Sequence, residues 1–309
     1  MSSSASNVPS LPDITTEKNT QLGGKIDQVG MAGIAIPLSI KSSSGQLLAS
    51  QATVDVTVNL DDADAKGIHM SRLYNLLQSH LSNQTLTTDT LKPLMLALIQ
   101  SQAGLSSEAI LTLHTDLVLL RPALASKASG YQSYKMAITA HQQKAHLNLT
   151  LAISVPYSST CPCSASLSRK ALADAFTQQF SDKNIDAETV SAWLASKEGS
   201  IATAHAQRSF ADVTLILRDP ELPDYTDIID LIENTLGTPL QTAVKREDEQ
   251  AFAKRNAENL MFVEDAVRRL HNAFSMYYQA TYFHVKVEHQ ESLHAHDAIA
   301  QSSGTVIQR

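Results

Sequence analysis

The stretch His-Leu-Asn-Leu-Thr-Leu-Ala-Ile-Ser-Val, residues 146–155, has the clearest alternation of apolar and polar side chains in this sequence. Leucine, isoleucine or valine occupies every second position, which is the period of a strand half buried in a sheet. The pattern closes a longer strand-like segment, Tyr134–Val155, that leads the backbone into Cys161-Pro162-Cys163-Ser164. We therefore expect a β-sheet with a strand that carries both cysteines of the chain just beyond its end.

The segments on either side of this strand repeat one order of elements. Upstream, the patterns predict strands at 34–38 and 54–60 around a turn at 41–45, helices at 71–81 and 91–102, and a strand at 109–120. Downstream, they predict a strand at 211–217, helices at 225–236 and 247–276, and a strand at 280–287. Strands separated by paired helices indicate antiparallel sheets with helices on one face, an α+β fold.

Two such halves suggest a duplicated unit. We expect a disordered lead-in at residues 1–24, which are rich in Ser, Thr and Asn, followed by a first module at 25–155 and a second at 156–309. Residues 165–203 interrupt the second module with a predicted helical pair that includes Trp193, the single tryptophan. By its pattern alone this insertion is a surface excursion without chemistry.

The composition is that of a soluble globular protein. The chain has 309 residues, of which 43% are hydrophobic and 18% charged, and a formal net charge of −7. This charge argues against broad nucleic-acid binding but permits a local basic pocket for a phosphorylated small molecule. Two cysteines in a CxC motif fit a reducing cytoplasm, and no apolar run approaches the length of a membrane helix.

The chemistry-bearing residues form a dispersed set. Cys161, Cys163 and His205 offer the sulfur and nitrogen ligands that suit Zn²⁺ and its neighbours, although a CxC motif also occurs where it only packs. His294 and His296 follow near the C-terminus. A phosphate-binding loop, a dinucleotide fingerprint, HExxH and GxSxG are all missing from the sequence, which removes the commonest nucleotide-binding and hydrolase signatures.

An acidic cluster lies on the predicted helix 247–276. On one continuous helix, Glu249 and Glu264 would project roughly 60° apart and Glu247 and Glu264 roughly 100°, so Glu249 pairs with Glu264 more naturally. The alternative is a solvated helix face on which basic residues balance the acids. The basic residues are Lys254, Arg255, Arg268 and Arg269.

Taken together, the motifs resemble those of the GTP cyclohydrolase IB family. The matching stretches are Leu11–Asp13, Lys66–Arg72, Cys161–Ser164, His205–Ser209, Lys245–Glu249, Glu258–Asp265 and Gln290–Asp297. They occur in the family's order along nearly the whole chain. The departures are the insertion at 165–203, where the family has a short connection, and Ala206, where Asn is usual.

The resemblance implies a tunnelling fold, in which two ββαα-type modules share a chain and subunits join their sheets into a barrel. It implies a homotetramer with shared active sites and the conversion of GTP and water to 7,8-dihydroneopterin triphosphate and formate. A divalent metal ion, Mn²⁺, Zn²⁺ or similar, would be held by Cys161, His205 and Glu249. Opening the imidazole ring of guanine requires a hydroxide at C8, which a metal ion provides by lowering the pKa of water.

The resemblance also assigns roles to further residues. His294 would transfer protons, Cys163 would assist or tune the site, and Glu264 would accept hydrogen bonds from the guanine N1–H and 2-amino group. The triphosphate would be bound by the cationic and imidazole side chains of the same motifs, His69, Arg72, Arg208, Lys245 and Arg246. Two alternatives are a nitrile reductase of the same fold, which uses its thiol as a nucleophile, and a protein that binds metal or pterin without turnover.

Overall fold

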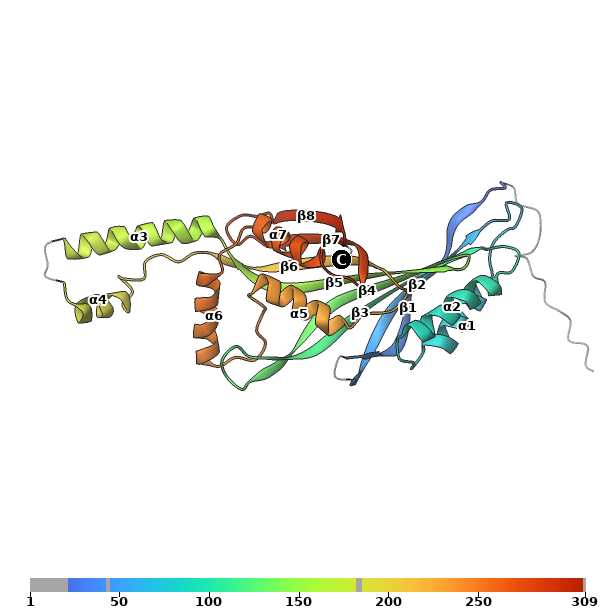
Figure 1. The fold of residues 1–309 in the computed structure, drawn as a ribbon, viewed down its shortest axis with the longest axis horizontal. Helices are drawn as coiled ribbons and strands as arrows, with labels where there is room; N and C mark the ends of the chain where they lie inside the picture. The colour runs from blue at the N-terminus through green and yellow to red at the C-terminus, as the bar shows by residue number, and fades with distance from the viewer. Residues whose placement is uncertain (1–21, 43–44, 182–184, 308–309) are drawn as a thin grey trace, which may run out of the picture. The chain divides into compact units, whose positions relative to one another are not determined.

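The computed structural model describes residues 22–42, 45–181 and 185–307. The predicted disorder up to residue 21 therefore lies outside the described residues. Figure 1 shows the helices and strands along the chain. They are β1 (Ile26–Lys41), β2 (Leu47–Leu60), α1 (Met70–Leu81), α2 (Thr88–Ser101), β3 (Glu108–Pro122), β4 (Ser129–Gln143), β5 (His146–Thr160), α3 (Pro162–Phe180), α4 (Ala187–Leu194), β6 (Ala206–Leu217), α5 (Tyr225–Leu236), α6 (Arg246–Glu258), α7 (Val263–Phe274), β7 (Ala280–His289) and β8 (Ala298–Thr305).

The strands are hydrogen-bonded to one another in chain order, from β1 to β8. The pairs β2–β3, β5–β6, β6–β7 and β7–β8 are all antiparallel. Short connections between consecutive strands, or a helical pair between them, are sufficient for this topology. The predicted α+β class with an antiparallel sheet is confirmed.

The chain divides into two compact units. The first consists of Met1–Ile40, Ala49–Thr115 and Ile138–Leu149, and the second of Lys41–Leu48, Asp116–Ala137 and Thr150–Arg309. These units cut across the strands, whereas the predicted modules divide the chain after residue 155. The two modules describe a predicted duplication of the order of elements, which compact units do not test. The division into modules therefore stays a prediction.

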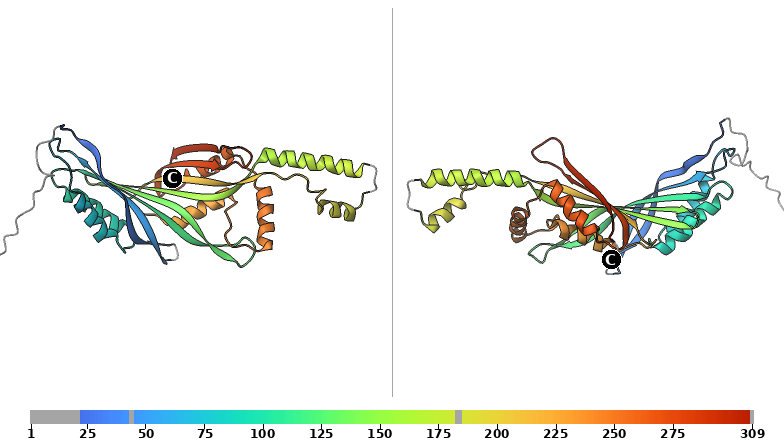
Figure 2. Two further views of the ribbon diagram at one scale, coloured as in Figure 1. Left: turned by 180° about the vertical axis from the view of Figure 1, so that it is seen from behind. Right: turned by 45° about the horizontal axis from the view of Figure 1, so that its top comes forward.

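In the first unit, α1 and α2 lie on one side of the strands (Figure 2). α1 buries Leu73, Leu77 and Leu81, which recur at the spacing of one helical face. On the strands, Val56 pairs with Leu111, and both side chains are completely buried. The predicted first hairpin and the two helices that follow it are confirmed.

In the second unit, α5 and α7 cover one face of the sheet. α7 packs against β7 and β8, and its Leu270 and Phe274 are completely buried. On β6, Ala211 and Val213 face this core, whereas Arg208, Phe210 and Asp212 alternate onto the opposite face, where they are exposed or half-buried. Helices on a single face of the sheet are what the sequence pattern predicts.

The predicted single helix at 247–276 is wrong, because α6 and α7 are separate helices. Asn259 ends α6 with φ −118° and ψ 55°, and its side-chain amide donates to the carbonyl of Leu236. The backbone N–H of Met261 then donates to the carbonyl of Thr160 at 3.3 Å. These tertiary hydrogen bonds break the helix, so the projected angles between Glu249 and Glu264 do not apply.

The strand-like segment Tyr134–Val155 also divides in two. Lys144 adopts φ 53°, in the left-handed region, and this residue turns the chain between β4 and β5. β8 was not predicted, because its sequence Ala-Ile-Ala-Gln-Ser-Ser-Gly-Thr is mostly small and polar. It forms nonetheless, since it pairs along its length with β7.

The segment 165–203 contains most of α3 together with α4, in agreement with the predicted helical pair. Within the second unit, α3 extends away from the sheet in both Figure 1 and Figure 2. Phe176, Phe180 and Trp193 pack together, with ring centroids 4.9–5.8 Å apart. Among the described residues, none of the helices is both long and apolar enough to cross a membrane.

Candidate active site

The ends of β5, β6 and β7 meet at one edge of the second unit. The strand register pairs Thr160 with Ala206 and Ser209 with His289. Cys161 follows β5 directly, His205 precedes β6, and the backbone N–H of Cys161 donates to the carbonyl of His205 at 3.3 Å. Two of the predicted metal ligands, far apart in sequence, are therefore neighbours in space.

The cysteine motif opens a helix. Cys161 is the N-cap of α3, and Pro162 is at the first helical position, where its missing N–H costs nothing. The proline of the motif thus begins a helix and does not form a tight turn. Cys161 is half-buried and Cys163 is exposed, and both are free thiols. The backbone N–H of His205 donates to the hydroxyl of Ser164 at 3.1 Å, which ties the two motifs together a second time.

Two side chains lie close to the Nδ1 atom of His205. The Oε1 atom of Gln207 lies 2.9 Å from Nδ1, at hydrogen-bonding distance. A carboxylate oxygen of Glu291 lies 4.0 Å from the same nitrogen. Both the imidazole and the Glu291 carboxylate are largely shielded, with 19% and 16% of their side-chain surfaces exposed. The ring is therefore fixed in orientation by neighbouring strand and loop residues.

A second histidine is buried behind this edge. The hydroxyl of Tyr157 and Nε2 of His289 are hydrogen-bonded at 2.8 Å. Burial lowers the pKa of His289 to about 4, and the negative charge of Glu264 opposes this shift. His289 is therefore neutral at neutral pH, and Glu264 is close enough to influence it.

Glu249 does not lie with Cys161 and His205 in this chain. It is in the first turn of α6, whereas Asn256, in the second half of this helix, is hydrogen-bonded to the end of β5: its Oδ1 accepts from the hydroxyl of Ser158 at 2.8 Å. An α-helix rises about 1.5 Å per residue, so Glu249 lies about 10 Å from Asn256 along the axis of α6. Among the described residues, no cluster of three or more Cys, His, Asp or Glu side chains is arranged to hold a metal ion.

The other predicted residues are distributed over both units. Lys245 and Arg246 are exposed at the start of α6, and Glu264 is exposed in the first turn of α7. His294 and His296 are exposed in the loop after β7, with rings stacked 5.1 Å apart.

His69 and Arg72 belong to the first unit, at the start of α1. The backbone N–H of His69 donates to Oε1 of Gln102 at 2.8 Å, and the Arg72 guanidinium donates to the carbonyl of Ser101 at 2.7 Å. Both contacts join the start of α1 to the end of α2. A structural role for these two residues is therefore visible within their own unit.

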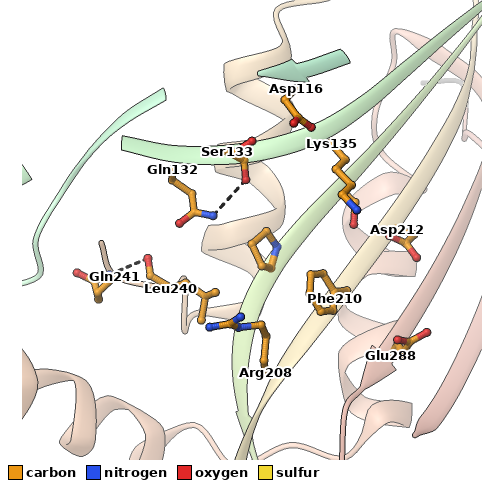
Figure 3. Close-up of a pocket in the computed structure, with 12 residues that line it drawn as sticks. Asp116, Gln132, Ser133, Lys135, Arg208, Phe210, Asp212, Leu240, Gln241 and Glu288 are labelled. Atoms are coloured by element: carbon orange, nitrogen blue, oxygen red, sulfur yellow. Dashed lines mark hydrogen bonds between the residues drawn. The ribbon is translucent and has the colours of Figure 1, made fainter. Parts of the chain in front are cut away.

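Arg208 lies in a hollow on the helix-free face of the sheet in the second unit (Figure 3). The hollow has a volume of about 610 Å³. Pro156, Phe210 and Leu240 supply apolar surface, while Lys135, Asp212 and Glu288 supply charges of both signs. A polar ligand could be bound here, but the lining does not select one sign of charge.

A second hollow, of about 440 Å³, adjoins the cysteine motif. It is formed by the first turns of α3, by residues 202–204 and 206, and by the second half of α6. Ala165, Leu172 and Leu260 contribute apolar surface, and Arg169 is the charged residue of the lining. The first turns of α3 thus belong to the surroundings of the site, whereas the distal aromatic cluster does not line this hollow.

Several polar residues of this edge carry no predicted role. Gln207 and Ser209 are buried on β6, where they are in phase with the core-facing Ala211 and Val213. Extending that alternation backwards along the strand would have identified them as inward-facing. Ser159 and Glu291 gave no such signal, because their importance depends on contacts across strands and loops.

Comparison of the structure with solved structures identifies the fold. It is similar to uricase from Arthrobacter globiformis, with a TM-score of 0.50 and 8% sequence identity over 93% of this chain and 96% of that one. A hyper-thermostable mutant of this uricase matches with the same TM-score. At such low identity the likeness concerns the fold alone. The α+β architecture is that of the tunnelling fold, as the family resemblance implies.

Comparison of the sequence identifies the family. Residues 11–300 match the family model described as type I GTP cyclohydrolase folE2. The chain is 47% identical to GTP cyclohydrolase FolE2 of Pseudoalteromonas atlantica over 94% of its length and 95% of the relative's. It is 44% identical to GTP cyclohydrolase FolE2 of Pseudomonas putida over 94% and 95%. The chain belongs to the type I GTP cyclohydrolase FolE2 family.

Proposed function

We propose that this protein converts GTP and water to 7,8-dihydroneopterin triphosphate and formate. The main observation behind this proposal is the hydrogen bond from the Cys161 N–H to the His205 carbonyl. It brings two motifs of the family together where β5 ends and β6 begins. The match of residues 11–300 to the family model supports it over nearly the whole chain. The product would serve pterin synthesis.

The residues at this edge fit a divalent metal ion. A cysteine sulfur and a histidine nitrogen at one place are donors that Zn²⁺ and related ions accept, and an additional carboxylate with one open position is typical of catalytic sites. Cys161 and His205 would hold the ion together with Glu249. When bound, the ion would act as a Lewis acid and would lower the pKa of a bound water molecule to about 7.

The protein residues would then orient the substrate and move protons. Glu264 would accept hydrogen bonds from the guanine N1–H and 2-amino group, because a carboxylate offers two oxygens at the required spacing. His294 would exchange protons with the substrate during deformylation and ring closure. Cys163 would stand beside the thiolate of Cys161, and Arg208, Lys245 and Arg246 would bind phosphates.

We also propose that the enzyme is a homotetramer in which a second copy completes each site. The position of Glu249 in the first turn of α6 supports this arrangement, since it is Asn256, seven residues further along, that is hydrogen-bonded to the end of β5. The exposed position of Glu249, Glu264 and His294 in the single chain supports it as well. Contributions from two copies would make assembly a condition of activity.

The experiment that tests the function is a product assay on the purified protein with GTP and Mn²⁺ or Zn²⁺. The proposal predicts formate and dihydroneopterin triphosphate in equal amounts. Consumption of NADPH with a nitrile substrate, and no formate from GTP, would indicate a reductase. Binding of GTP or metal with no product under any metal condition would indicate a protein without turnover.

A further inference from the structure

A chain of buried polar side chains runs from His205 into the sheet. Nδ1 of His205 lies 2.9 Å from Oε1 of Gln207, and Nε2 of Gln207 donates to the hydroxyl of Ser159 at 2.6 Å. The hydroxyls of Ser159 and Ser209 are in turn hydrogen-bonded at 2.8 Å. Gln207 is 8% exposed, and Ser159 and Ser209 are completely buried. Four side chains thus form one connected network.

The strands fix the geometry of this network. Ser159 is directly opposite Gln207 in the β5–β6 register, and Gln207 and Ser209 are two residues apart on the core-facing side of β6. Buried polar groups are costly when they lack partners, and both ends of the Gln207 amide have one here. The amide is consequently held in place by the sheet and can hold the imidazole ring.

The chemistry of the amide determines the proton on the ring. With the Gln207 amide in this orientation its oxygen can only accept a hydrogen bond, so Nδ1 of His205 is the donor and carries the proton. The Glu291 carboxylate, 4.0 Å from Nδ1, favours a proton at the same nitrogen. A neutral imidazole with its proton on Nδ1 has its lone pair on Nε2.

We propose that Gln207 is a positioning residue that fixes the Nδ1–H tautomer of His205 and presents Nε2 as the metal-binding nitrogen. The inference rests on the proposed function only in assuming that His205 binds metal. Hydrogen-bonding partners of metal-ligating histidines set ring orientation and basicity, and their removal typically lowers metal affinity by about 10- to 100-fold. Ser159 and Ser209 would act through Gln207, by keeping its oxygen directed at the ring.

The tautomer can be tested without metal or substrate. In metal-free protein with ¹⁵N-labelled histidine at pH 8, the ring nitrogens of His205 are assigned by comparison with His205→Asn. We expect the proton on Nδ1. A dominant Nε2–H form would overturn the proposal, because the Gln207 amide would then be reversed and would donate to Nδ1. The tautomer itself is read from the unaltered chain, and His205→Asn serves only to assign its signals.

The effect on metal binding can be tested with three variants. Gln207→Met removes the acceptor at similar volume, Gln207→Glu keeps an acceptor, and Gln142→Met makes the same change at a buried glutamine of the other unit, whose Nε2 donates to the carbonyl of Lys144. The readout is Co²⁺ affinity, followed by the visible absorption of the bound ion. We expect about 10- to 100-fold weaker binding for Gln207→Met and values near wild type for the other two.

The outcomes separate this inference from the proposed function. Equal affinity of wild type and Gln207→Met, or an equal loss in Gln142→Met, would contradict the role of Gln207. Loss of affinity in Gln207→Met with retention in Gln207→Glu would support it, even if the protein formed no product from GTP. Failure of all forms to bind Co²⁺ would overturn the metal-binding part of both proposals.

Discussion

Asp248 accepts two hydrogen bonds from Ser126, one from its backbone N–H at 2.8 Å and one from its hydroxyl at 2.6 Å. The same carboxylate accepts from the backbone N–H groups of Ala125 and Lys245, both at 2.8 Å. Asp248 is completely buried, so α6 begins on the loop between β3 and β4. This clamp positions the start of α6, where Lys245 and Glu249 also lie.

Replacing Asp248 with Ala should destabilise the protein and reduce turnover together. The change would leave backbone N–H groups of Ala125 and Ser126 without their acceptor, and the start of α6 would lose its fixed position. We expect a melting temperature lower by at least about 5 °C and a loss of activity of more than about tenfold. Glu247→Ala, an exposed neighbour in the same turn, is the stability control and should melt near wild type.

The pH dependence of this clamp has a definite sign. The hydrogen bonds from Ser126, Lys245 and Ala125 hold the pKa of Asp248 well below its usual range. A lowered folded-state pKa means that the stabilisation is present above the unfolded pKa of about 4 and is lost only in stronger acid. A stabilising contribution of Asp248 that changed between pH 6 and 8 would contradict the clamp.

His289 should make the stability depend on pH in a higher range. Its pKa is lowered to about 4 by burial, whereas an unfolded histidine titrates near 6.5, so the unfolded state binds more protons between these values. The stabilising contribution of the neutral His289 is therefore present above about pH 6.5 and is lost as the pH decreases towards 4. The linkage amounts to about 2 kcal/mol between pH 7 and pH 5.

Urea unfolding of wild type and His289→Gln at these two pH values measures this contribution. The glutamine variant should be less stable at pH 7, because Tyr157 loses its ring partner, but its stability should fall less on acidification. An identical fall in both proteins would show that His289 is not the group responsible.

The distal part of the α3–α4 segment should be dispensable for chemistry. Phe176, Phe180 and Trp193 pack on one another, whereas the first turns of α3 line the hollow beside the cysteine motif. Replacing residues 174–200 with a short Gly/Ser linker should leave metal affinity and turnover within about threefold of wild type, because loop closure depends only weakly on length. An assembled variant that bound no metal would show that the segment shapes the site.

The sharing of sites between copies can be tested by mixing two inactive variants. Cys161→Ala and Glu249→Ala should each lack activity. If the two residues reach a site from different chains, unfolding and reassembling an equal mixture should restore about a quarter of the sites. Half of the chains have an intact Cys161 and half have an intact Glu249, and the two chains that form a site are selected independently. A mixture that remained inactive, although mixed oligomers were detected, would assign both residues to one chain.

The extent to which the sequence predicts this structure differs between elements. The alternation at 146–155 and the apolar face of 225–236 predict β5 and α5 correctly, because these elements bury a regular stripe of side chains. The break between α6 and α7 is not predictable in this way. It depends on hydrogen bonds from Asn259 and Met261 to distant backbone carbonyls, and no local pattern encodes those partners.

The candidate site shows the same division. The motifs around Cys161 and His205 are visible in the sequence, and the antiparallel register of β5 and β6 explains why they meet. The link from Gln207 to Ser159 requires the register itself, since the two residues are opposite each other on different strands. For Glu249 the sequence and the single chain differ. The family resemblance places it in one metal site with Cys161 and His205, whereas in the single chain it lies in the first turn of α6, away from them.

The most direct measurement is the fate of C8 of guanine. GTP labelled with ¹³C at C8 is incubated with the Mn²⁺-loaded protein and followed by ¹³C NMR, with His205→Ala as the control. The proposed reaction predicts that the label leaves the purine and accumulates as formate, in equal amount to the pterin product, and that His205→Ala releases none. A label that stays in the guanine ring of GTP, with metal bound at Cys161 and His205, would contradict the proposed function.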